Sequence, residues 1–258
     1  TLDPDAEGVL PVCFGKATKL CDLLTDKDKT YQAVLHLGVV TDTQDMTGEI
    51  LEQKDAAVSE TEVREAILGF VGEYAQVPPM YSALKVNGKK LCDLAREGKT
   101  VERKARKIKI LEITIDQIAL PFVTMTVTCS KGTYIRTLCN DIGEKLGCGA
   151  AMESLLRTKV GRFTLDDAIT LAQTEEAVQE GTIESKILGI EEILAEYPRV
   201  CCTKEGDRLL ANGNPLVQAL VDAQEKNGWI RMCSSEGSFA GVYQWDEKRN
   251  RYFPVKMF

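Results

Sequence analysis

Histidine is nearly absent from this chain of 258 residues, which contains only His36. Zinc sites of the usual kinds are built from His and Cys, so a single histidine argues against a metal centre. A Ser-His or Cys-His triad is also excluded, unless His36 itself serves. That residue lies in the run YQAVLHLGVV, which is typical of a strand, and we expect it to be packed there. We therefore predict no bound metal.

Cysteine pairs and long apolar runs are missing as well. The nine cysteines are odd in number and scattered, and none forms a C-x-x-C pair. This pattern favours reduced thiols in a cytoplasmic protein over a disulfide framework. No apolar run approaches the roughly 18 residues that a membrane span needs, and no Gly-rich nucleotide fingerprint is present. The sequence therefore predicts a cytoplasmic globular protein with no membrane partner.

Charge is unevenly distributed along the chain. The net charge is −7, yet residues 81–162 hold 16 Lys and Arg against 8 Asp and Glu, while the remainder holds 16 against 31. A local basic face of this kind is enough to hold phosphate groups. The same stretch also fits long, solvated side chains with no partner. Charge alone therefore leaves nucleic-acid binding open.

The spacing of apolar residues predicts an α+β fold. An S-E-T-E capping box opens an amphipathic helix over 59–71. Apolar residues alternate with threonine over 122–129, which predicts a half-buried antiparallel strand. The run VLPV at 9–12 is typical of a short strand, and two prolines make 76–91 a loop, with a hairpin turn at 86–89.

Later segments complete this organisation. TYIRTLCNDIGEKLG predicts a helix that ends at Gly147, and WIRMCSS, SFAGVYQW and RYFPVKM predict three short strands in a meander. The segment AEYPRV, at residues 195–200, marks a boundary between the helical region and the three strands. We therefore expect a mixed, mainly antiparallel sheet flanked by helices in residues 1–194, followed by a small β module in residues 195–258.

Three stretches carry polar residues that the fold alone does not explain. In the opening TLDP, proline biases Asp3 to an extended conformation, although an acid before proline is also a common turn opener. SKGTYIRT lies where a strand ends and a helix begins; Arg136 there is either a partner for a buried acid or a surface helix residue. In DKTYQA, Tyr31 enters a strand, where a lone tyrosine is usually core or interface filler.

Taken together, these stretches follow an order and spacing that resembles the TruB family, the bacterial tRNA pseudouridine synthases of the T-loop uridine. The matching motifs are LDPDAEGVLP, DKTYQA, TDTQDMTGEI, PPMYSALKVNGKKLCDLAREG, CSKGTYIRTLCNDIGEKLGCGA and LLRTKVGRF. The resemblance runs from Thr1 to about residue 170 and continues more weakly into a PUA-like module around ANGNPL. Each motif alone is weak evidence, but the whole set in the order and spacing of the family is specific for the resemblance.

The resemblance implies a pseudouridine synthase fold with a defined set of site residues. Asp3 corresponds to the catalytic nucleophile of the family, and Arg136 to the arginine that pairs with it. Tyr31 corresponds to a tyrosine that stacks on the flipped uracil and is a candidate for a late proton transfer. Tyr134 and Leu155 correspond to walls of the base pocket.

An RNA-binding surface is implied as well. Tyr81 and Lys85, in PPMYSALK, match the segment that flanks the RNA-binding insertion, and Lys131 lies just upstream of the helix motif. The basic run over 103–109 would face tRNA phosphates. The expected partner is the T-arm stem-loop of tRNA, bound by a monomer with help from the PUA-like module.

The implied reaction needs no cofactor. It breaks the N1–C1′ bond of uridine, turns the uracil and joins C5 to C1′, with no net gain or loss of atoms. An ionised Asp3 can assist either by attacking C1′ or by removing a sugar proton to give a glycal, and the sequence favours neither route. Arg136 would keep that carboxylate ionised in a site closed to water.

Two other functions stay open on the sequence. The basic face and the PUA-like module would suffice for a non-catalytic tRNA-binding or folding-chaperone protein, although gripping RNA needs no buried acid. A small-molecule hydrolase would need two converging acids, such as Asp3 with Asp42 or Asp45.

In the family pattern a segment of roughly 40 residues precedes Asp3. It contains a Lys-Pro loop, a first strand and a Gly-His pair, and we expect the catalytic domain here to lack it.

Overall fold

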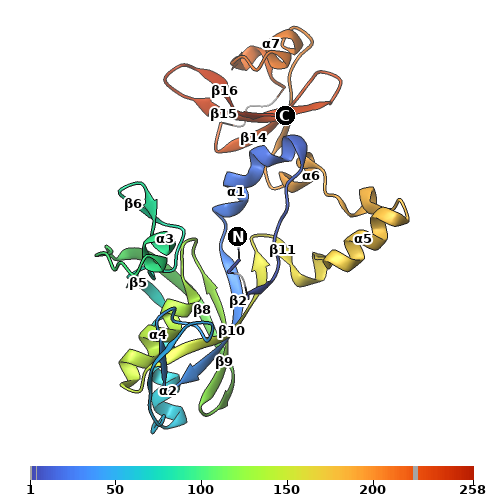
Figure 1. Cartoon of the computed structure of the whole chain (residues 1–258). Coiled ribbons are helices and arrows are strands. Elements are labelled where there is room, and N and C mark those ends of the chain that lie inside the picture. Colours follow the sequence, from blue (N-terminus) through green and yellow to red (C-terminus); the bar gives the residue numbers. More distant parts are fainter. Residues whose placement is uncertain (1, 4, 223–225) are drawn as a thin grey trace. The chain divides into compact units, whose positions relative to one another are not determined.

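The computed structural model describes residues 2–3, 5–222 and 226–258 (Figure 1). The chain forms two compact units, which are Thr1–Val12 with Leu23–Ala168, and Cys13–Asp22 with Ile169–Phe258. Both units combine strands with helices, so the α+β class predicted from the sequence is confirmed. Pro4, which was expected to hold Asp3 extended, lies outside the described residues.

A seven-stranded sheet forms the centre of the first unit. Its strand order is β1-β10-β2-β9-β8-β5, with β11 paired to β10, and all pairings are antiparallel except β1 with β10. The strands are β1 (Glu7–Gly8), β2 (Lys29–Leu37), β5 (Gly72–Gln76), β8 (Arg106–Ala119), β9 (Phe122–Cys129), β10 (Ala150–Val160) and β11 (Phe163–Thr164). Burial alternates along β9 as its Thr-rich pattern predicted.

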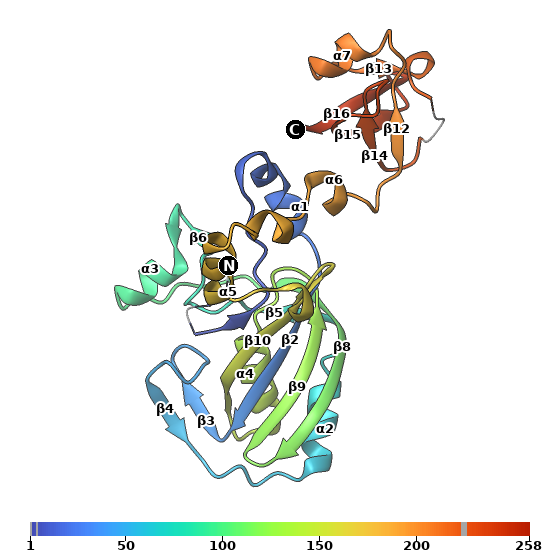
Figure 2. The ribbon, with the colours of Figure 1, turned by 90° about the vertical axis from the view of Figure 1, so that its right-hand side faces the viewer.

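Two helices cover one face of this sheet. They are α2 (Glu60–Leu68) and α4 (Ile135–Leu146), and Figure 2 shows α4 behind strands β10 and β2. Ser59 and Glu62 form the predicted capping box of α2, and Gly147 ends α4 with a left-handed φ of 76°. Apolar side chains of both helices pack with those of β2, β8, β9 and β10 in one buried core.

The rest of the first unit consists of short elements that leave the sheet. A hairpin joins β3 (Val39–Thr41) to β4 (Ile50–Gln53), and a second joins β6 (Lys85–Val86) to β7 (Lys89–Lys90), followed by α3 (Leu91–Arg96). The predicted turn at 86–89 is confirmed: Asn87 and Gly88 have positive φ values of 52° and 84°, as a primed hairpin turn requires.

The sequence prediction was wrong at two places in this unit. The expected strand at 9–12 is not formed. Instead β1 pairs with β10, and the last hydrogen bond of this pairing is donated by the Val9 N–H to the Arg157 carbonyl. Pro11 has no N–H with which to continue the ladder. Strand β5 was missed because GEYAQ has one strong strand former and a glycine.

The second unit contains a five-stranded sheet of order β12-β14-β15-β16-β13, which includes the predicted meander. Its strands are β12 (Arg199–Cys201), β13 (Leu216–Val217), β14 (Trp229–Cys233), β15 (Phe239–Asp246) and β16 (Arg251–Met257). Its helices include α5 (Leu171–Gln179), α6 (Ile190–Ile193) and α7 (Asp207–Ala211), and α1 (Cys21–Thr25) links it to the first unit along the chain.

The boundary expected at 194/195 falls between α6 and β12, inside the second unit. Ten residues from the N-terminal region, Cys13–Asp22, belong to this unit and carry the 3-10 turn over Gly15–Leu20. No helix within the described ranges is long and apolar enough to cross a membrane.

Candidate active site

The loop that carries Asp3 is tied to the edge of the central sheet. Gly8 lies opposite Arg157 in the parallel pairing of β1 with β10, and its φ is 114°. A Cβ at this position would lie 2.2 Å from the Arg157 carbonyl oxygen, so only glycine allows the approach. The Val9 N–H donates to the same carbonyl and the Arg157 Nε donates to the Val9 carbonyl, both at 2.8 Å.

This attachment brings Asp3 to the end of the sheet where α4 begins. The Asp3 carbonyl accepts a hydrogen bond from the Ala6 N–H at 3.1 Å, as a turn-opening acid does. Its carboxylate lies 3.1 Å and 3.2 Å, through its two oxygens, from Nη2 of Arg136. The predicted pair of Asp3 with Arg136 is therefore formed in the structure.

Arg136 is a buried cation with three polar partners. Only 8% of its side chain is exposed. Besides binding Asp3, Nη2 donates to the Tyr81 carbonyl at 2.8 Å, and Nη1 donates to Asp45 at 3.2 Å. The surface-helix alternative for Arg136 is thus wrong, because the guanidinium points inward and is fixed by groups from three separate segments.

Asp45 is the second carboxylate on this guanidinium. Its side chain is 10% exposed, against 43% for Asp3. The Oδ1 of Asp45 accepts from the Thr43 hydroxyl at 2.7 Å, and from the Thr47 N–H and hydroxyl at 3.1 and 2.6 Å. Its two oxygens are thereby engaged, one by threonines and one by Arg136, whereas Asp3 keeps solvent access.

Tyr31 lies on β2 directly opposite Arg157 of β10. It is partly buried and packs against the core of the first unit together with Leu155. Burial raises the pKa of the Tyr31 phenol, and the nearby Cys129 and Asp3 add to this increase. A raised pKa keeps the phenol neutral at physiological pH.

The two predicted walls of the base pocket lie on separate elements. Tyr134 is the N-cap residue of α4, two positions before Arg136. Leu155 lies on β10 opposite Ala33 of β2, between two irregularities in the strand register. Register shifts of this kind bend a strand and redirect its side chains, and they are frequent beside functional sites.

The remaining predicted substrate contacts lie further out. The Tyr81 hydroxyl donates to Asp42 at 3.2 Å, while its backbone carbonyl holds Arg136. Lys85 is exposed in the β6–β7 hairpin. Lys131 is exposed and forms an ion pair with Asp26.

Several structural contributors were not identified from the sequence. The sequence indicates Asp45 only as half of a hydrolase pair, and no sequence signal indicates the backbone role of Tyr81. The two prolines predict a loop that includes Gln76, yet Gln76 is buried on β5 and bound to Tyr134. Arg157 lies within the LLRTKVGRF motif, and no sequence signal indicates that its side chain binds the Val9 carbonyl. His36 was predicted correctly: its ring packs on Phe122 and its Nδ1 lies 3.1 Å from Glu153.

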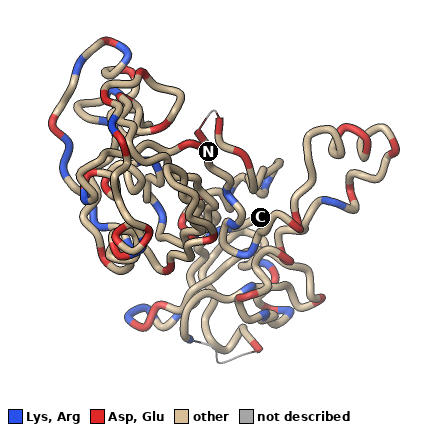
Figure 3. The backbone as a smooth tube through the Cα atoms, turned by 90° about the horizontal axis from the view of Figure 1, so that it is seen from below, with Lys and Arg blue, Asp and Glu red and all other residues tan. Residues whose placement is uncertain are grey.

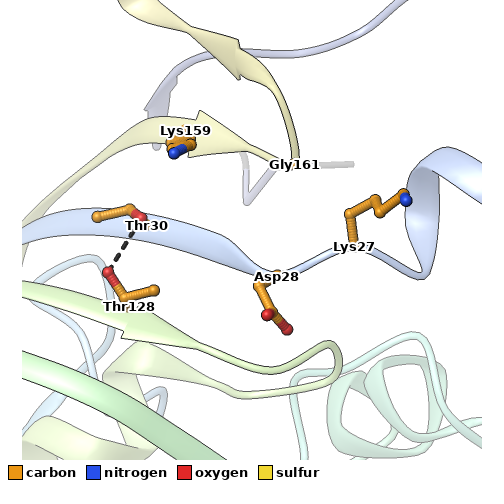
Figure 4. Close-up of a pocket in the computed structure, with 6 residues that line it drawn as sticks. All are labelled: Lys27, Asp28, Thr30, Thr128, Lys159 and Gly161. Carbon is orange, nitrogen blue, oxygen red and sulfur yellow. Dashed lines mark hydrogen bonds between the residues drawn. The ribbon is translucent and has the colours of Figure 1, made fainter. Parts of the chain in front are cut away.

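A pocket of about 290 Å³ lies elsewhere on the sheet (Figure 4), lined by Lys27, Asp28, Thr30, Thr128, Lys159 and Gly161. The Thr30 and Thr128 hydroxyls share a hydrogen bond of 3.1 Å. Because Thr30 directly precedes Tyr31 in a strand, the two side chains point to opposite faces of the sheet. This pocket is therefore separate from the pair of Asp3 with Arg136.

Basic side chains gather on loops and strands near the second hairpin. Lys and Arg positions recur along the left side of Figure 3, interspersed with Asp and Glu, and Figure 1 shows β5, β6 and α3 on that side. Within the run 103–109, Lys107 and Lys109 are exposed on β8, whereas Arg103 donates to the Pro78 carbonyl at 3.1 Å. In the described part of the chain, no three His, Cys, Asp or Glu side chains are grouped to hold a metal ion.

Comparison with known proteins identifies the family. The sequence model of the TruB family pseudouridylate synthase N-terminal domain matches residues 1–135, and that of the tRNA pseudouridylate synthase B C-terminal domain matches residues 136–195. The tRNA pseudouridine synthase B of Lachnoclostridium phytofermentans is 51% identical, over 100% of this chain and 88% of the relative. That of Clostridium acetobutylicum is 45% identical, over 96% and 85%.

Solved structures share the fold at lower identity. A Cbf5-Nop10-Gar1 complex aligns with a TM-score of 0.71 and 23% identity, covering 99% of this chain and 74% of the other. An H/ACA RNP bound to a substrate RNA containing 2'-deoxyuridine aligns with a TM-score of 0.70 and 22% identity, covering 100% and 74%. By its sequence motifs, its relatives and its fold, the chain belongs to the TruB family of pseudouridine synthases.

Proposed function

We propose that this chain is a tRNA pseudouridine synthase that isomerises the T-loop uridine, with Asp3 as the catalytic carboxylate. The observation that carries the proposal is the ion pair of half-exposed Asp3 with buried Arg136, beside the neutral phenol of Tyr31. The relatives named tRNA pseudouridine synthase B, at about half identity over nearly the whole chain, support the same reaction and substrate class.

The chemistry asks for a carboxylate that stays ionised where a positive charge develops. As the N1–C1′ bond breaks, the sugar carbon becomes electron-poor, and the uracil leaves as an anion. Asp3 can then attack C1′, or remove the C2′ proton to give a glycal, and both routes need its negative charge. Arg136 supports that charge. When the uracil rejoins through C5, the C1′–O bond to Asp3 breaks on the first route, and Asp3 returns the proton to C2′ on the second. C5 then loses a proton while N1 gains one.

Tyr31 serves this reaction best as a neutral group. A phenolate beside Asp3 would place two negative charges in one pocket, and the raised pKa of Tyr31 avoids that. The neutral ring offers a stacking surface that keeps the detached uracil in place, with Tyr134 and Leu155 as further walls. The phenolic oxygen is then available to pass a proton late in the reaction.

The RNA has to be opened before this chemistry can begin. Flipping the uridine out of the T-loop costs a few kcal/mol, which contacts to the phosphate backbone would offset. Lys107 and Lys109 on β8, Lys85 in the hairpin and Lys131 are exposed cations suited to that role, and the five-stranded sheet of the second unit is the PUA-like candidate for a further contact. We infer that the boundary of that module lies near residue 195.

A single chain supplies every residue of the proposed site, so we propose a monomeric enzyme. All nine cysteines are free thiols. Free thiols persist in a reducing compartment, which supports a cytoplasmic location, where tRNA is modified. The reaction as written uses no cofactor.

The two competing functions explain the geometry less well. A non-catalytic tRNA-binding protein would have no use for Arg136 buried against two carboxylates. A hydrolase with paired acids would need Asp45 or Asp42 free to act with Asp3. Asp45 is fully engaged by threonines and Arg136, and Asp42 accepts from the Glu49 N–H at 2.8 Å and from Tyr81.

The test is isomerisation of a T-arm hairpin that contains uridine. After incubation, a chemical label specific for pseudouridine, together with tritium release from C5, should report conversion by the wild-type chain. Asp3→Asn should lose conversion completely while its affinity for the hairpin stays within about tenfold, because the charge serves the reaction more than binding. If the hairpin binds but neither chain converts it, the RNA-binding function is correct instead.

A further inference from the structure

Gln76 ends strand β5 and is almost completely buried, with 1% of its surface exposed. A buried amide destabilises a protein unless both of its polar ends find partners. Both ends of the Gln76 amide bind the backbone of one residue: Oε1 accepts from the Tyr134 N–H at 2.8 Å, and Nε2 donates to the Tyr134 carbonyl at 3.0 Å. The Tyr74 side chain is a further hydrogen-bond partner of Gln76. The Gln76 side chain thus binds the Tyr134 backbone at two points, as a neighbouring strand would.

Tyr134 is the residue from which helix α4 starts. It is the N-cap, with extended φ and ψ values of −101° and 109°, and its carbonyl also accepts the first helical hydrogen bond, from the Leu138 N–H at 3.1 Å. Most N-cap residues fix the helix start with a short polar side chain. The Tyr134 side chain makes no such bond to α4 within the described chain. Gln76 instead fixes the N-cap backbone from outside the helix.

The position of Arg136 depends on this arrangement. It is the second residue of α4, so its side chain leaves a backbone whose direction is set two residues earlier. Its guanidinium has to meet Asp3, Asp45 and the Tyr81 carbonyl within 3.2 Å. A rotation at Tyr134 would move the wall of the base pocket and the partner of Asp3 together. A misplacement of about 1 Å at a reacting group can lower a rate roughly 10²-fold.

Strand β5 holds the helix at a second point. Tyr74 lies two residues before Gln76, on the same face of the strand. Its hydroxyl donates to Asp141, further along α4. Immediately after Gln76 the chain enters the proline loop and the β6–β7 hairpin, the segment proposed to contact RNA. Gln76 therefore joins the base of the RNA-binding segment to the start of the catalytic helix.

We propose that Gln76 is a positioning residue for the isomerisation, which sets the Tyr134 backbone so that Tyr134 and Arg136 face the flipped uridine correctly. The inference rests on the proposed function. It assigns Gln76 to turnover more than to RNA affinity, since the amide is buried and its hydrogen bonds go to the Tyr134 backbone.

Two substitutions test the assignment. Gln76→Leu keeps most of the volume and removes both hydrogen bonds to the Tyr134 backbone, and should lower kcat roughly tenfold to 100-fold with the KM for a T-arm hairpin changed less than about threefold. Gln76→Glu restores the pattern only when its new carboxyl is protonated, because it then donates to the Tyr134 carbonyl and accepts from the N–H. Burial raises the pKa of such a carboxyl.

The predicted signature is therefore a pH-dependent rescue. Between about pH 8 and pH 5.5, the kcat of Gln76→Glu relative to the wild type should rise several-fold as the pH falls, while the relative kcat of Gln76→Leu stays constant. The matched control is Val123→Ala, which creates a cavity in the core at the far end of β9. It should lower thermal stability comparably and leave kcat within twofold of the wild type.

Amide hydrogen exchange gives a readout that does not depend on activity. The Tyr134 N–H should exchange at least tenfold faster in Gln76→Leu than in the wild type or in Val123→Ala. A folded Gln76→Leu variant with wild-type kcat, or a relative kcat of Gln76→Glu that does not change with pH, overturns the inference while the proposed function stands. A wild-type chain that binds the hairpin without isomerising it overturns the proposed function, whatever the exchange rate at Tyr134.

Discussion

The opening loop and the 41–48 loop each present a carboxylate to the guanidinium of Arg136, and they hold it in opposite ways. Asp3 makes its side-chain contact with Arg136 and remains 43% exposed. Asp45 is 10% exposed and accepts three further hydrogen bonds from Thr43 and Thr47. A carboxylate saturated by donors has little reactivity left, whereas one held by a single cation remains available. We therefore infer that Asp45 fixes Arg136 in place, and that Asp3 is the carboxylate left free to act in the proposed reaction.

Removing Arg136 affects both carboxylates and should have the largest combined effect on stability and turnover. Arg136→Ala leaves Asp45 buried without its cation, so the free energy of unfolding should fall by about 3–5 kcal/mol. Turnover should fall roughly 10³-fold. Urea unfolding and single-turnover isomerisation measure the two effects.

A lysine at the same position separates charge from geometry. Arg136→Lys keeps the positive charge but cannot span both carboxylates with a planar fork. Compared with Arg136→Ala, the lysine variant should recover a larger share of the lost stability than of the lost turnover. An Arg136→Ala variant as stable as the wild type would show that Asp45 does not depend on this cation.

Asp45→Asn should have the next largest effect. The amide can still accept from Thr47, but its NH₂ group opposes the Arg136 guanidinium, so stability should fall by about 1–3 kcal/mol and turnover roughly tenfold. Asp42→Asn is the matched control, because Asp42 accepts from the Glu49 N–H and the Tyr81 hydroxyl and, among the described residues, forms no hydrogen bond or ion pair with Arg136. Equal losses of turnover in the two variants would contradict the role given to Asp45.

Much of this site could be predicted from the sequence because its chemistry resides in local motifs. Asp3, Tyr31 and Arg136 each stand in a short stretch whose order identifies the family. The supporting contacts could not be predicted, because they join segments far apart in the chain. Gln76 and Tyr134 are 58 residues apart, and the Tyr81 carbonyl that holds Arg136 is a backbone group common to every residue. Strand β5 was missed since tertiary pairing with β8, rather than its own propensity, makes it a strand.

Substitutions of Tyr31 test the residue that is proposed to stack on the uracil beside Asp3. Tyr31→Phe keeps the stacking ring and should lower turnover about tenfold if the hydroxyl passes a proton, whereas Tyr31→Leu should lower it further. Burial raises the pKa of Tyr31, so the phenol stays neutral as the pH rises and the ratio of wild-type to Tyr31→Phe turnover should be constant from about pH 7 to pH 9.5. A ratio that changes with an apparent pKa near 8 would mean that an ionised Tyr31 takes part.

The exposed pair of Lys131 with Asp26 should show the smallest effect. Both side chains are more than half exposed, and such pairs stabilise proteins little. Lys131→Ala should leave the melting temperature unchanged and weaken hairpin binding about two- to threefold, with one phosphate contact fewer in the salt dependence. Unchanged affinity and salt dependence would remove Lys131 from the RNA-binding surface.

The most direct test compares Asp3→Asn with Asp45→Asn in the same two assays, urea unfolding and single-turnover isomerisation of a T-arm hairpin. The division of roles predicts that Asp3→Asn unfolds like the wild type and has no measurable turnover, while Asp45→Asn is less stable and still turns over. Retention of a tenth of the wild-type rate by Asp3→Asn, or a complete loss in a folded Asp45→Asn, would contradict the assignment of the reaction to Asp3.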